Sequence, residues 1–425
     1  MAYAGEAPKP GFRLGMLIYD TRYRSLTIQL IVLVLFAFGL SWLINNVIVN
    51  LAAKDRTFDY GFLWNRAGYD INQTLIPYTN DSTHGRALFV GLVNTLVVAA
   101  LGCFLATILG VIIGVLRLSK NWLIGRVMTV YVEVFRNIPL LLWILLSFVI
   151  LTETTPSPKD FRVTDEMVAA GQAPVARMFL NDSVAITNRG MNVPAPLFER
   201  SLGTAGIGEF QISLNFLAIF AVIGASAIVN RRMVRRARAI QEDTGVRPVT
   251  WWKSLALLFV PVIALMLALG FHLEYPRMTR FNFSGGIEVL HSFTALLVAL
   301  VLYTAAFIAE IVRAGILAIP RGQTEAAFAL GLRPGRTMNL IILPQALRVI
   351  IPPLISQYLN LTKNTSLAIA VSYMDLRGTL GGVTLNQTGK ELECMLLMML
   401  IYLTISLIIS SVMNIYNASV RLKER

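Results

Sequence analysis

Residues 313–350 read RAGILAIPRGQTEAAFALGLRPGRTMNLIILPQALRVI, and this segment lies between two long apolar runs near 289–315 and 351–372. The segment is only modestly hydrophobic, so it does not read as a further membrane crossing. It is also longer than most connections between adjacent helices. We therefore expect two membrane-spanning helices joined by a connector that has a structure of its own.

The connector carries helix start and stop signals. Pro320 and Gly322 interrupt the preceding helix, and residues 323–332 then have the composition of a short, alanine-rich helix. The residues expected to bend the chain next are Gly331, Pro334 and Gly335. A short rigid helix with small side chains on one face can enter a groove on a partner protein. The alternative is an ordinary amphipathic connector that lies on the membrane surface.

The composition of the whole chain agrees with a membrane protein. Of 425 residues, 56% are hydrophobic and 14% are charged. Soluble globular proteins carry about 45–50% apolar and about 25% charged residues. The composition therefore excludes a soluble enzyme and a disordered protein. The three histidines and two cysteines are scattered, so we expect no metal site.

Eight apolar runs are long enough to cross about 30 Å of hydrocarbon as helices. They lie near 26–50, 87–116, 136–152, 212–230, 254–273, 289–315, 351–372 and 394–420. The third run is the weakest, because its apolar part is short. The predicted fold is an all-α, polytopic membrane helix bundle of about eight transmembrane spans. The segment 153–211 is expected to be an irregular outer loop.

Basic residues orient the spans. The segments that connect the spans alternate between the two sides of the membrane. Those on one side carry more lysine and arginine than aspartate and glutamate, and those on the other side do not. The basic segments are 1–25, 117–126, 231–253, 313–350 and 421–425. Positively charged loops stay in the cytoplasm, so both termini are expected inside. The arginine-rich run 231–238 then sets topology at the lipid headgroups. A nucleic-acid patch is the rival interpretation, but the run lies between two spans, so we expect a lipid bilayer and no nucleic acid.

The connector resembles a known family motif. Glu325-Ala326-Ala327, Gly331 and Ile341-x-Leu343-Pro344 match the EAA loop of binding-protein-dependent ABC transporter permeases at every fixed position. In that family the loop is a coupling helix that docks into a groove on the ATPase subunit. The resemblance implies a docking face made of Glu325, Ala326, Ala327 and Gly331. It also implies polar contacts by Glu325 and by Arg333 or Arg336, and anchoring to the next span by Ile341, Leu343 and Pro344.

Four further segments resemble the polar amino-acid permeases, the histidine/glutamine/opine group. They are 303–316, 91–96, 131–140 and 363–367. The enlarged pattern, with an extra N-terminal span and an insertion, is similar to permease subunits of general L-amino-acid and glutamate/glutamine/aspartate/asparagine transport systems. The resemblance implies a five-span ABC importer core within the bundle.

The expected order of parts follows. It is a cytoplasmic N-terminus (1–25), an extra span with an outer loop (26–86), the first part of the core (87–152), an insertion with an outer loop and two spans (153–285), the second part of the core (286–420) with the coupling loop (316–350), and a cytoplasmic tail (421–425).

The chain has no phosphate-binding G-x-x-x-x-G-K-[ST] motif: Gly389-Lys390 is followed by Glu391. The resemblance therefore implies an importer of the inner membrane in which Mg-ATP is used by two separate ATP-binding subunits, with no cofactor bound by this chain. It further implies a second permease subunit, identical or a paralogue, and a periplasmic amino-acid-binding protein.

Polar residues within the spans are candidates for a substrate path. Glu310 and Arg313 are three residues apart and can pair on one helix face, and a structural pair is the favoured interpretation. Consecutive polar residues within a span need a protein-lined or wet environment; here they are Lys363, Asn364, Thr365 and Ser366. The Lys363 ammonium could meet a substrate carboxylate, and helix packing is the alternative.

Two other function classes remain at this point. An ion-gradient-driven secondary amino-acid transporter would need buried acidic ion ligands or paired broken helices, and Glu310 alone is thin support. A membrane-embedded enzyme would need a cluster of catalytic side chains, which the spans do not show.

Overall fold

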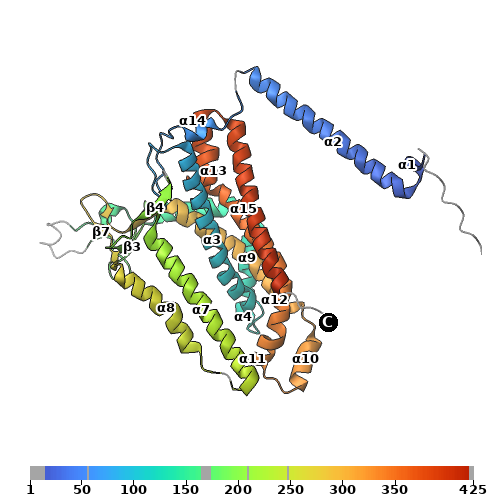
Figure 1. Cartoon of the computed structure of the whole chain (residues 1–425). Helices are drawn as coiled ribbons and strands as arrows, with labels where there is room; N and C mark the ends of the chain where they lie inside the picture. Colours follow the sequence, from blue (N-terminus) through green and yellow to red (C-terminus); the bar gives the residue numbers. More distant parts are fainter. Residues whose placement is uncertain (1–14, 55–56, 164–173, 208–209, 247, 421–425) are drawn as a thin grey trace, which may run out of the picture. The chain divides into compact units, whose positions relative to one another are not determined.

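The structure of the protein is a computed structural model that describes residues 15–54, 57–163, 174–207, 210–246 and 248–420 (Figure 1). The chain divides into two compact units, residues 1–62 and 63–425. The expected cytoplasmic tail, 421–425, and residues 1–14 of the expected N-terminal segment lie outside the described residues.

The first unit is dominated by one long helix. After the short α1 (Met16–Tyr19), α2 runs from Thr21 to Ala52 and is 32 residues long. At 1.5 Å per residue this is about 48 Å, more than enough to cross a bilayer. Most of its apolar side chains are exposed within the unit, which is the composition of a helix with lipid around it. The structure confirms the expected additional N-terminal span.

The second unit is built around two helices in close contact, α3 (His84–Leu116) and α9 (His291–Leu317). A Cβ added at Gly110 would lie 2.6 Å from the Ile308 Cβ, and one at Gly114 would lie 2.7 Å from the Ala309 carbonyl oxygen. Only glycine permits this approach of the two helices. The helices that pack around this pair are α4 (Trp122–Asn137), α5 (Leu140–Thr154) and α12 (Leu343–Asn364), and α15 (Glu391–Val420) packs against α12.

Among the described residues, seven helices are long and apolar enough to cross a membrane, and the number is eight if the bent pair α4–α5 is counted as one span. The predicted all-α bundle of about eight spans is confirmed. The third span differs from the prediction of 136–152, because α4 and α5 meet at an angle of 106°. Ile138 has extended backbone angles before Pro139, as a residue preceding proline prefers, and the helix is broken there.

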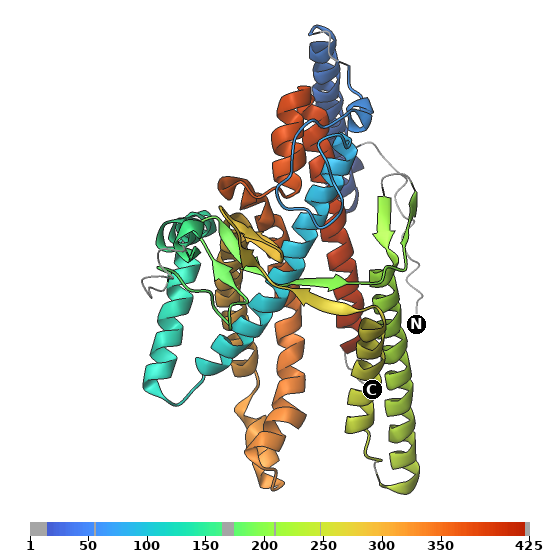
Figure 2. The ribbon, with the colours of Figure 1, turned by 90° about the vertical axis from the view of Figure 1, so that its left-hand side faces the viewer.

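The insertion contains a helical hairpin, α7 (Leu214–Thr244) and α8 (Trp251–Ala268), which confirms its two expected spans. Figure 2 shows the two helices side by side. The expectation of an irregular loop over 153–211 is wrong, since this segment forms short antiparallel strands. The pairs are β1 (Ala185–Ile186) with β2 (Gly190–Val193), β2 with β9 (Ile287–Leu290), β3 (Ala195–Phe198) with β6 (Phe271–Glu274), β4 (Thr204–Ile207) with β5 (Phe210–Ser213), and β7 (Arg277–Met278) with β8 (Phe283–Ser284).

The remaining elements are short and irregular. Beyond α12 the chain turns through Ser372, which has a positive φ of 57°. The short helices are η1 (Gly61–Trp64), η2 (Pro158–Phe161), α10 (Arg321–Ala329), α11 (Pro334–Thr337), η3 (Met338–Ile342), η4 (Thr365–Val371), α13 (Leu376–Gly378), η5 (Thr379–Thr384) and α14 (Leu385–Thr388). The seventh span is therefore followed by broken helix rather than by a simple loop.

Candidate functional site: the connector between α9 and α12

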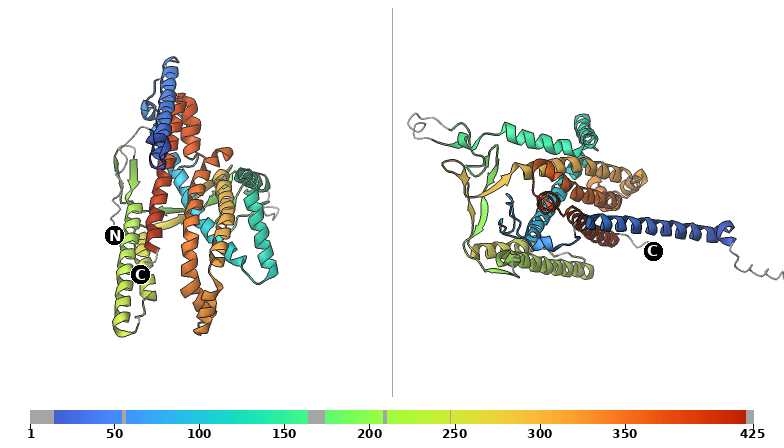
Figure 3. Two further views of the ribbon diagram at one scale, coloured as in Figure 1. Left: turned by 90° about the vertical axis from the view of Figure 1, so that its right-hand side faces the viewer. Right: turned by 90° about the horizontal axis from the view of Figure 1, so that it is seen from above.

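The connector forms a compact helical turn at one end of the second unit. It comprises α10, α11 and η3, and Figure 3 (left) shows this orange segment at the lower end of the helices that it joins. α9 ends at Leu317, and Pro320 provides the extended residue before α10. The short alanine-rich helix expected over 323–332 is confirmed, because α10 covers Arg321–Ala329.

Gly331 ends α10 in the left-handed conformation. Its φ is +74°, a value that side-chain-bearing residues rarely adopt. The Leu332 amide donates to the Ala327 carbonyl at 3.1 Å, and the Gly331 amide donates to the Phe328 carbonyl at 2.9 Å. These bonds satisfy carbonyls at the helix end. The expected bend at Gly331 thus has a specific backbone requirement.

The residues of the expected docking face divide between two sides of α10. Glu325 and Ala326 are exposed, as is Gly331. Ala327 is only 1% exposed and packs against the rest of the connector, so it contributes no accessible surface in this structure. Two apolar residues that sequence reasoning missed are exposed instead, Phe328 at 49% and Leu330 at 81%. The signal for both was available, because large apolar side chains are unusual at a helix end outside a membrane.

The other connector residues lie in or beside α11, η3 and the start of α12. Arg333 precedes α11, and its carbonyl oxygen accepts hydrogen bonds from the backbone amides of Arg336 and Thr337. The side chains of Arg333 and Arg336 are both exposed. Ile341 is half-buried in η3. Leu343 and Pro344 begin α12, where a proline in the first turn costs no helical hydrogen bond.

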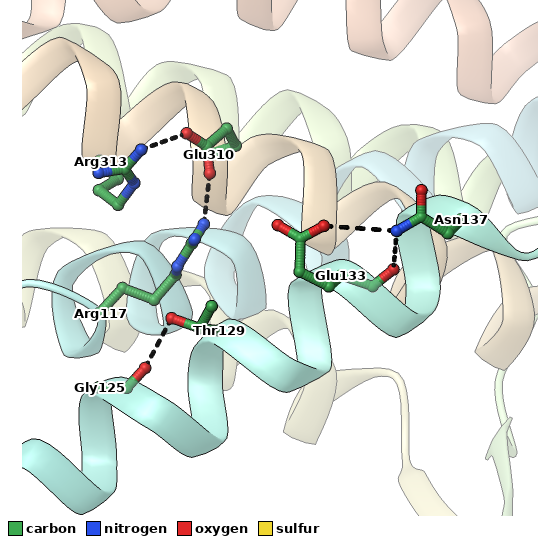
Figure 4. Close-up of polar contacts among 7 residues, drawn as sticks. All are labelled: Arg117, Gly125, Thr129, Glu133, Asn137, Glu310 and Arg313. Carbon is green, nitrogen blue, oxygen red and sulfur yellow. Dashed lines mark hydrogen bonds and ion pairs between the residues drawn. The ribbon is translucent and has the colours of Figure 1, made fainter.

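Glu310 lies between two arginines near the end of α9 (Figure 4). Its Oε1 accepts from the Arg313 Nη2 at 2.6 Å, which confirms the predicted i,i+3 pair. Its Oε2 accepts from the Arg117 Nη1. Arg117 directly follows α3, and its side chain is 8% exposed. Both carboxylate oxygens are therefore occupied, and the cluster joins the ends of the two central helices.

The end of α4 is also fixed to α9. The Asn137 Nδ2 donates to the Glu133 carbonyl at 2.7 Å and to its Oε2 at 3.3 Å (Figure 4). Arg136 places its guanidinium carbon 5.3 Å from the centre of the Phe307 ring. The Tyr131 hydroxyl donates to the Leu302 carbonyl at 2.7 Å. The Arg136 and Tyr131 contacts hold α4 against α9, while the Asn137 hydrogen bonds lie within the last turn of α4.

The four candidate path residues lie at the break after α12. Lys363 is exposed, and Asn364 is the last residue of the helix. Thr365 is buried and donates to the Thr362 carbonyl at 2.8 Å, and Ser366 donates to the Lys363 carbonyl at 2.8 Å. The Lys363 side chain is exposed and Asn364 is half-buried, while the two hydroxyls donate to backbone carbonyls of the helix end.

Asp375 was not anticipated from the sequence. It is fully buried, and its Oδ1 accepts the Gly378 amide at 2.8 Å while its Oδ2 accepts the Tyr402 hydroxyl at 3.3 Å. Neighbouring contacts tie the same turn to α3. The Asn94 amide donates to the Met374 carbonyl at 2.9 Å, and the Thr95 hydroxyl accepts from the Leu376 amide at 3.0 Å.

The candidate spans and the structured connector that joins two of them are features of an integral membrane protein. Residues 251–422 match the family model described as "Binding-protein-dependent transport system inner membrane component". The chain is 70% identical over the full length of both chains to the glutamate/glutamine/aspartate/asparagine transport system permease protein BztB of Rhodobacter capsulatus. It is 42% identical to the general L-amino acid transport system permease protein AapQ of Rhizobium johnstonii, over 98% of this chain and 96% of that one.

A partial likeness exists to a second permease of the first organism. The chain is 34% identical to the glutamate/glutamine/aspartate/asparagine transport system permease protein BztC of R. capsulatus. This match covers 47% of this chain and 44% of BztC. The full-length matches decide the family. The chain belongs to the inner membrane components of binding-protein-dependent transport systems, and it is a permease subunit of a multi-subunit ABC complex.

Proposed function

We propose that this chain forms the translocation path of an ATP-driven importer for polar amino acids, with glutamate, glutamine, aspartate and asparagine as its substrates. The substrate assignment is supported by the relative named for these four amino acids, which is 70% identical along its entire length. The relative named for general L-amino acids supports the wider class.

The observation that carries the coupling role is the exposed end of α10. Glu325 and Ala326 lie beside the large apolar side chains of Phe328 and Leu330, which are half to four-fifths exposed. An apolar pair with a polar neighbour is the surface that a groove on another protein would bury. The sequence has no phosphate-binding loop, so the ATPase is a separate subunit that binds Mg-ATP, and this chain binds no cofactor.

The complete complex is proposed to contain two ATP-binding subunits, a second permease that is a paralogue, and a periplasmic amino-acid-binding protein. ABC ATPases act in pairs, and each ATPase subunit offers one groove. Because this chain has one connector, a second permease chain is needed to fill the second groove. The occurrence of two differently named permease proteins for one transport system in R. capsulatus supports a paralogue.

The mechanism proposed for coupling uses the packing of α9. Closure of the ATPase pair would move α10. Because α9 immediately precedes α10 in the chain, this movement would pass through α9 into the bundle. Arg117 and Glu310 join the ends of α3 and α9, so the two helices would move together. Alternating access then follows from a rocking of packed helices rather than from local unfolding.

The orientation is proposed from charge. The connector and the arginine-rich end of α7 lie on the cytoplasmic side, and both termini lie there as well. At the break after α12, Lys363 is proposed to meet a substrate carboxylate, with Asn364, Thr365 and Ser366 shaping the path and Glu310 at its inner end.

The test is purification of the tagged chain in mild detergent, followed by identification of its partners and uptake in proteoliposomes. The expected result is recovery of an ATPase and a second permease, with ATP-dependent uptake of labelled glutamate when the binding protein is present. A chain that purifies alone and transports amino acids under an ion gradient without ATP would overturn the proposal and favour a secondary transporter.

A further inference from the structure

The α7–α8 hairpin lies in the insertion, residues 153–285, and the proposed coupling role of the connector gives this insertion no function. Its outer end is held by strands, because β5 leads into α7 and β6 follows α8. Within the described residues the hairpin helices pack mainly against each other and against those strands. Only Asn215, Ser226 and Ala237 of α7 are buried, and no residue of α8 is. Among the described residues, the support of the inner end of the hairpin therefore comes mainly from the packing of α7 and α8 on each other.

That inner end is strongly basic. α7 is 31 residues long, about 46 Å, whereas its apolar part covers only about the first half. The charged part continues as unbroken helix and carries five exposed arginines: Arg231, Arg232, Arg235, Arg236 and Arg238. We call these five residues the α7 arginine cluster. Its members are one to seven residues apart, so they occupy two adjoining rows on one side of the helix.

The cluster lacks an ion-pair partner among the described residues. In the part of the chain that the structure describes, none of the five arginines forms an ion pair with an acidic side chain. The nearest acidic residues in sequence are Glu242 and Asp243, at the far end of the helix. Five adjacent positive charges repel one another, so an anion that approaches them lowers this repulsion and is attracted to the cluster.

The start of α8 adds a second, independent feature at the same end. Trp251 is 68% exposed and Trp252 is 52% exposed, and the Lys253 ammonium lies 5.4 Å from the centre of the Trp252 ring. Exposed tryptophans on a spanning helix lie at the level of the headgroups, where the ring is apolar and its N–H finds a polar partner. Because α7 and α8 are joined by a short turn, the tryptophans and the arginine cluster share the inner interface.

We propose that the α7 arginine cluster binds the phosphate groups of anionic phospholipids in the inner leaflet, and that this binding anchors the inner end of the α7–α8 hairpin. Arginine suits this role because its planar fork donates two parallel hydrogen bonds to a phosphate. The attraction is electrostatic and acts within about a Debye length of the surface.

The test uses the assembled complex with the full-length chain and two lipids, phosphatidylglycerol and phosphatidylcholine. Retained lipid is titrated and counted by native mass spectrometry for the unmodified chain, for Arg235→Gln/Arg236→Gln, and for the charge-conserving control Arg235→Lys/Arg236→Lys. Each arginine near an anionic surface contributes about fivefold to affinity. The glutamine variant should therefore bind phosphatidylglycerol roughly 25-fold more weakly, and the lysine variant should stay within about threefold.

Salt and neutral lipid complete the design. Binding of phosphatidylglycerol should weaken as sodium chloride is raised, and phosphatidylcholine should not be retained by the cluster. Equal retention of phosphatidylglycerol by the glutamine variant and the unmodified chain would overturn the proposal, as would equal retention of the two lipids. Loss of the ATPase with lipid retention unchanged would assign the cluster to a protein partner instead. The melting temperature of each variant shows whether the complex is intact.

Discussion

Arg117 and Glu310 are 193 positions apart in sequence, yet they form an ion pair that joins the end of α3 to α9. Glu310 holds Arg313 with its other oxygen, at 2.6 Å. The pair lies two turns before α9 ends and the connector begins. A contact at this place connects the segment proposed to meet the ATPase with the centre of the bundle.

Replacing Glu310 by glutamine should weaken both stability and coupling. The Arg117 side chain is 8% exposed and would lose its charged acceptor, so the free energy of unfolding should fall by about 1–3 kcal/mol. Uptake per ATP hydrolysed should fall by roughly fivefold or more, the range typical of a lost coupling interaction. Thermal melting and paired uptake and ATPase assays measure the two effects.

The matched control is Glu133→Gln. Glu133 lies in the same region, but its carboxylate meets only the Asn137 amide at 3.3 Å. This variant should keep normal coupling. Similar behaviour of the two variants would show that general loss of charge, and not the link between α3 and α9, is responsible.

Replacing Gly331 by alanine should uncouple ATP hydrolysis from transport. Its φ of +74° costs an alanine about 1–2 kcal/mol, so the connector would leave its present conformation. Gly335→Ala is the control, because a Cβ there meets open space and no positive φ is required. ATPase activity that stays tied to uptake in Gly331→Ala would remove the bend from the coupling mechanism.

Replacing Leu330 by aspartate should weaken assembly with the ATPase. The side chain is 81% exposed, so the substitution leaves the folded chain intact but places a charge in the proposed apolar contact. Loss of a central contact costs about 2 kcal/mol, roughly thirtyfold in affinity. Co-purification of the ATPase measures the change. Phe281→Asp, at a 71% exposed residue next to β8, is the control and should assemble normally.

Replacing Lys363 by alanine should raise the KM for glutamate while the complex remains assembled. A hydrogen bond between an ammonium and a carboxylate contributes about 1.5–3 kcal/mol, which corresponds to a change of tenfold or more. Lys363→Arg keeps the charge and should retain much of the affinity. Unchanged uptake kinetics in the alanine variant would remove Lys363 from the substrate path, which would then have to be sought elsewhere, for example near Asp375.

The spans and the connector could be predicted because their signals are local. An apolar run of sufficient length specifies a spanning helix, and Pro320 and Gly331 mark the two ends of α10 through their backbone preferences. The Glu310–Arg313 pair was predictable for the same reason, since helical spacing alone brings the two residues together.

What could not be predicted depends on tertiary packing. Arg117 reaches Glu310, and Tyr402 reaches Asp375, only because separate helices meet, and no sequence spacing reports these contacts. The strands between β1 and β9 were missed because they are two to four residues long and too short to show alternating hydrophobicity. Ala327 was assigned to the docking face from its motif position, but the local fold of α10 turns it inward.

Gly110 and Gly114 leave no side chain between α3 and α9 where the two helices meet. Without flexible side chains to absorb a displacement, one helix cannot slide far along the other before backbone atoms collide. The two helices are therefore expected to move as one rigid unit, with the contact between Arg117 and Glu310 joining them at one end. A displacement of α10 would then tilt α3 and α9 together, and motion is expected where other helices pack against this pair.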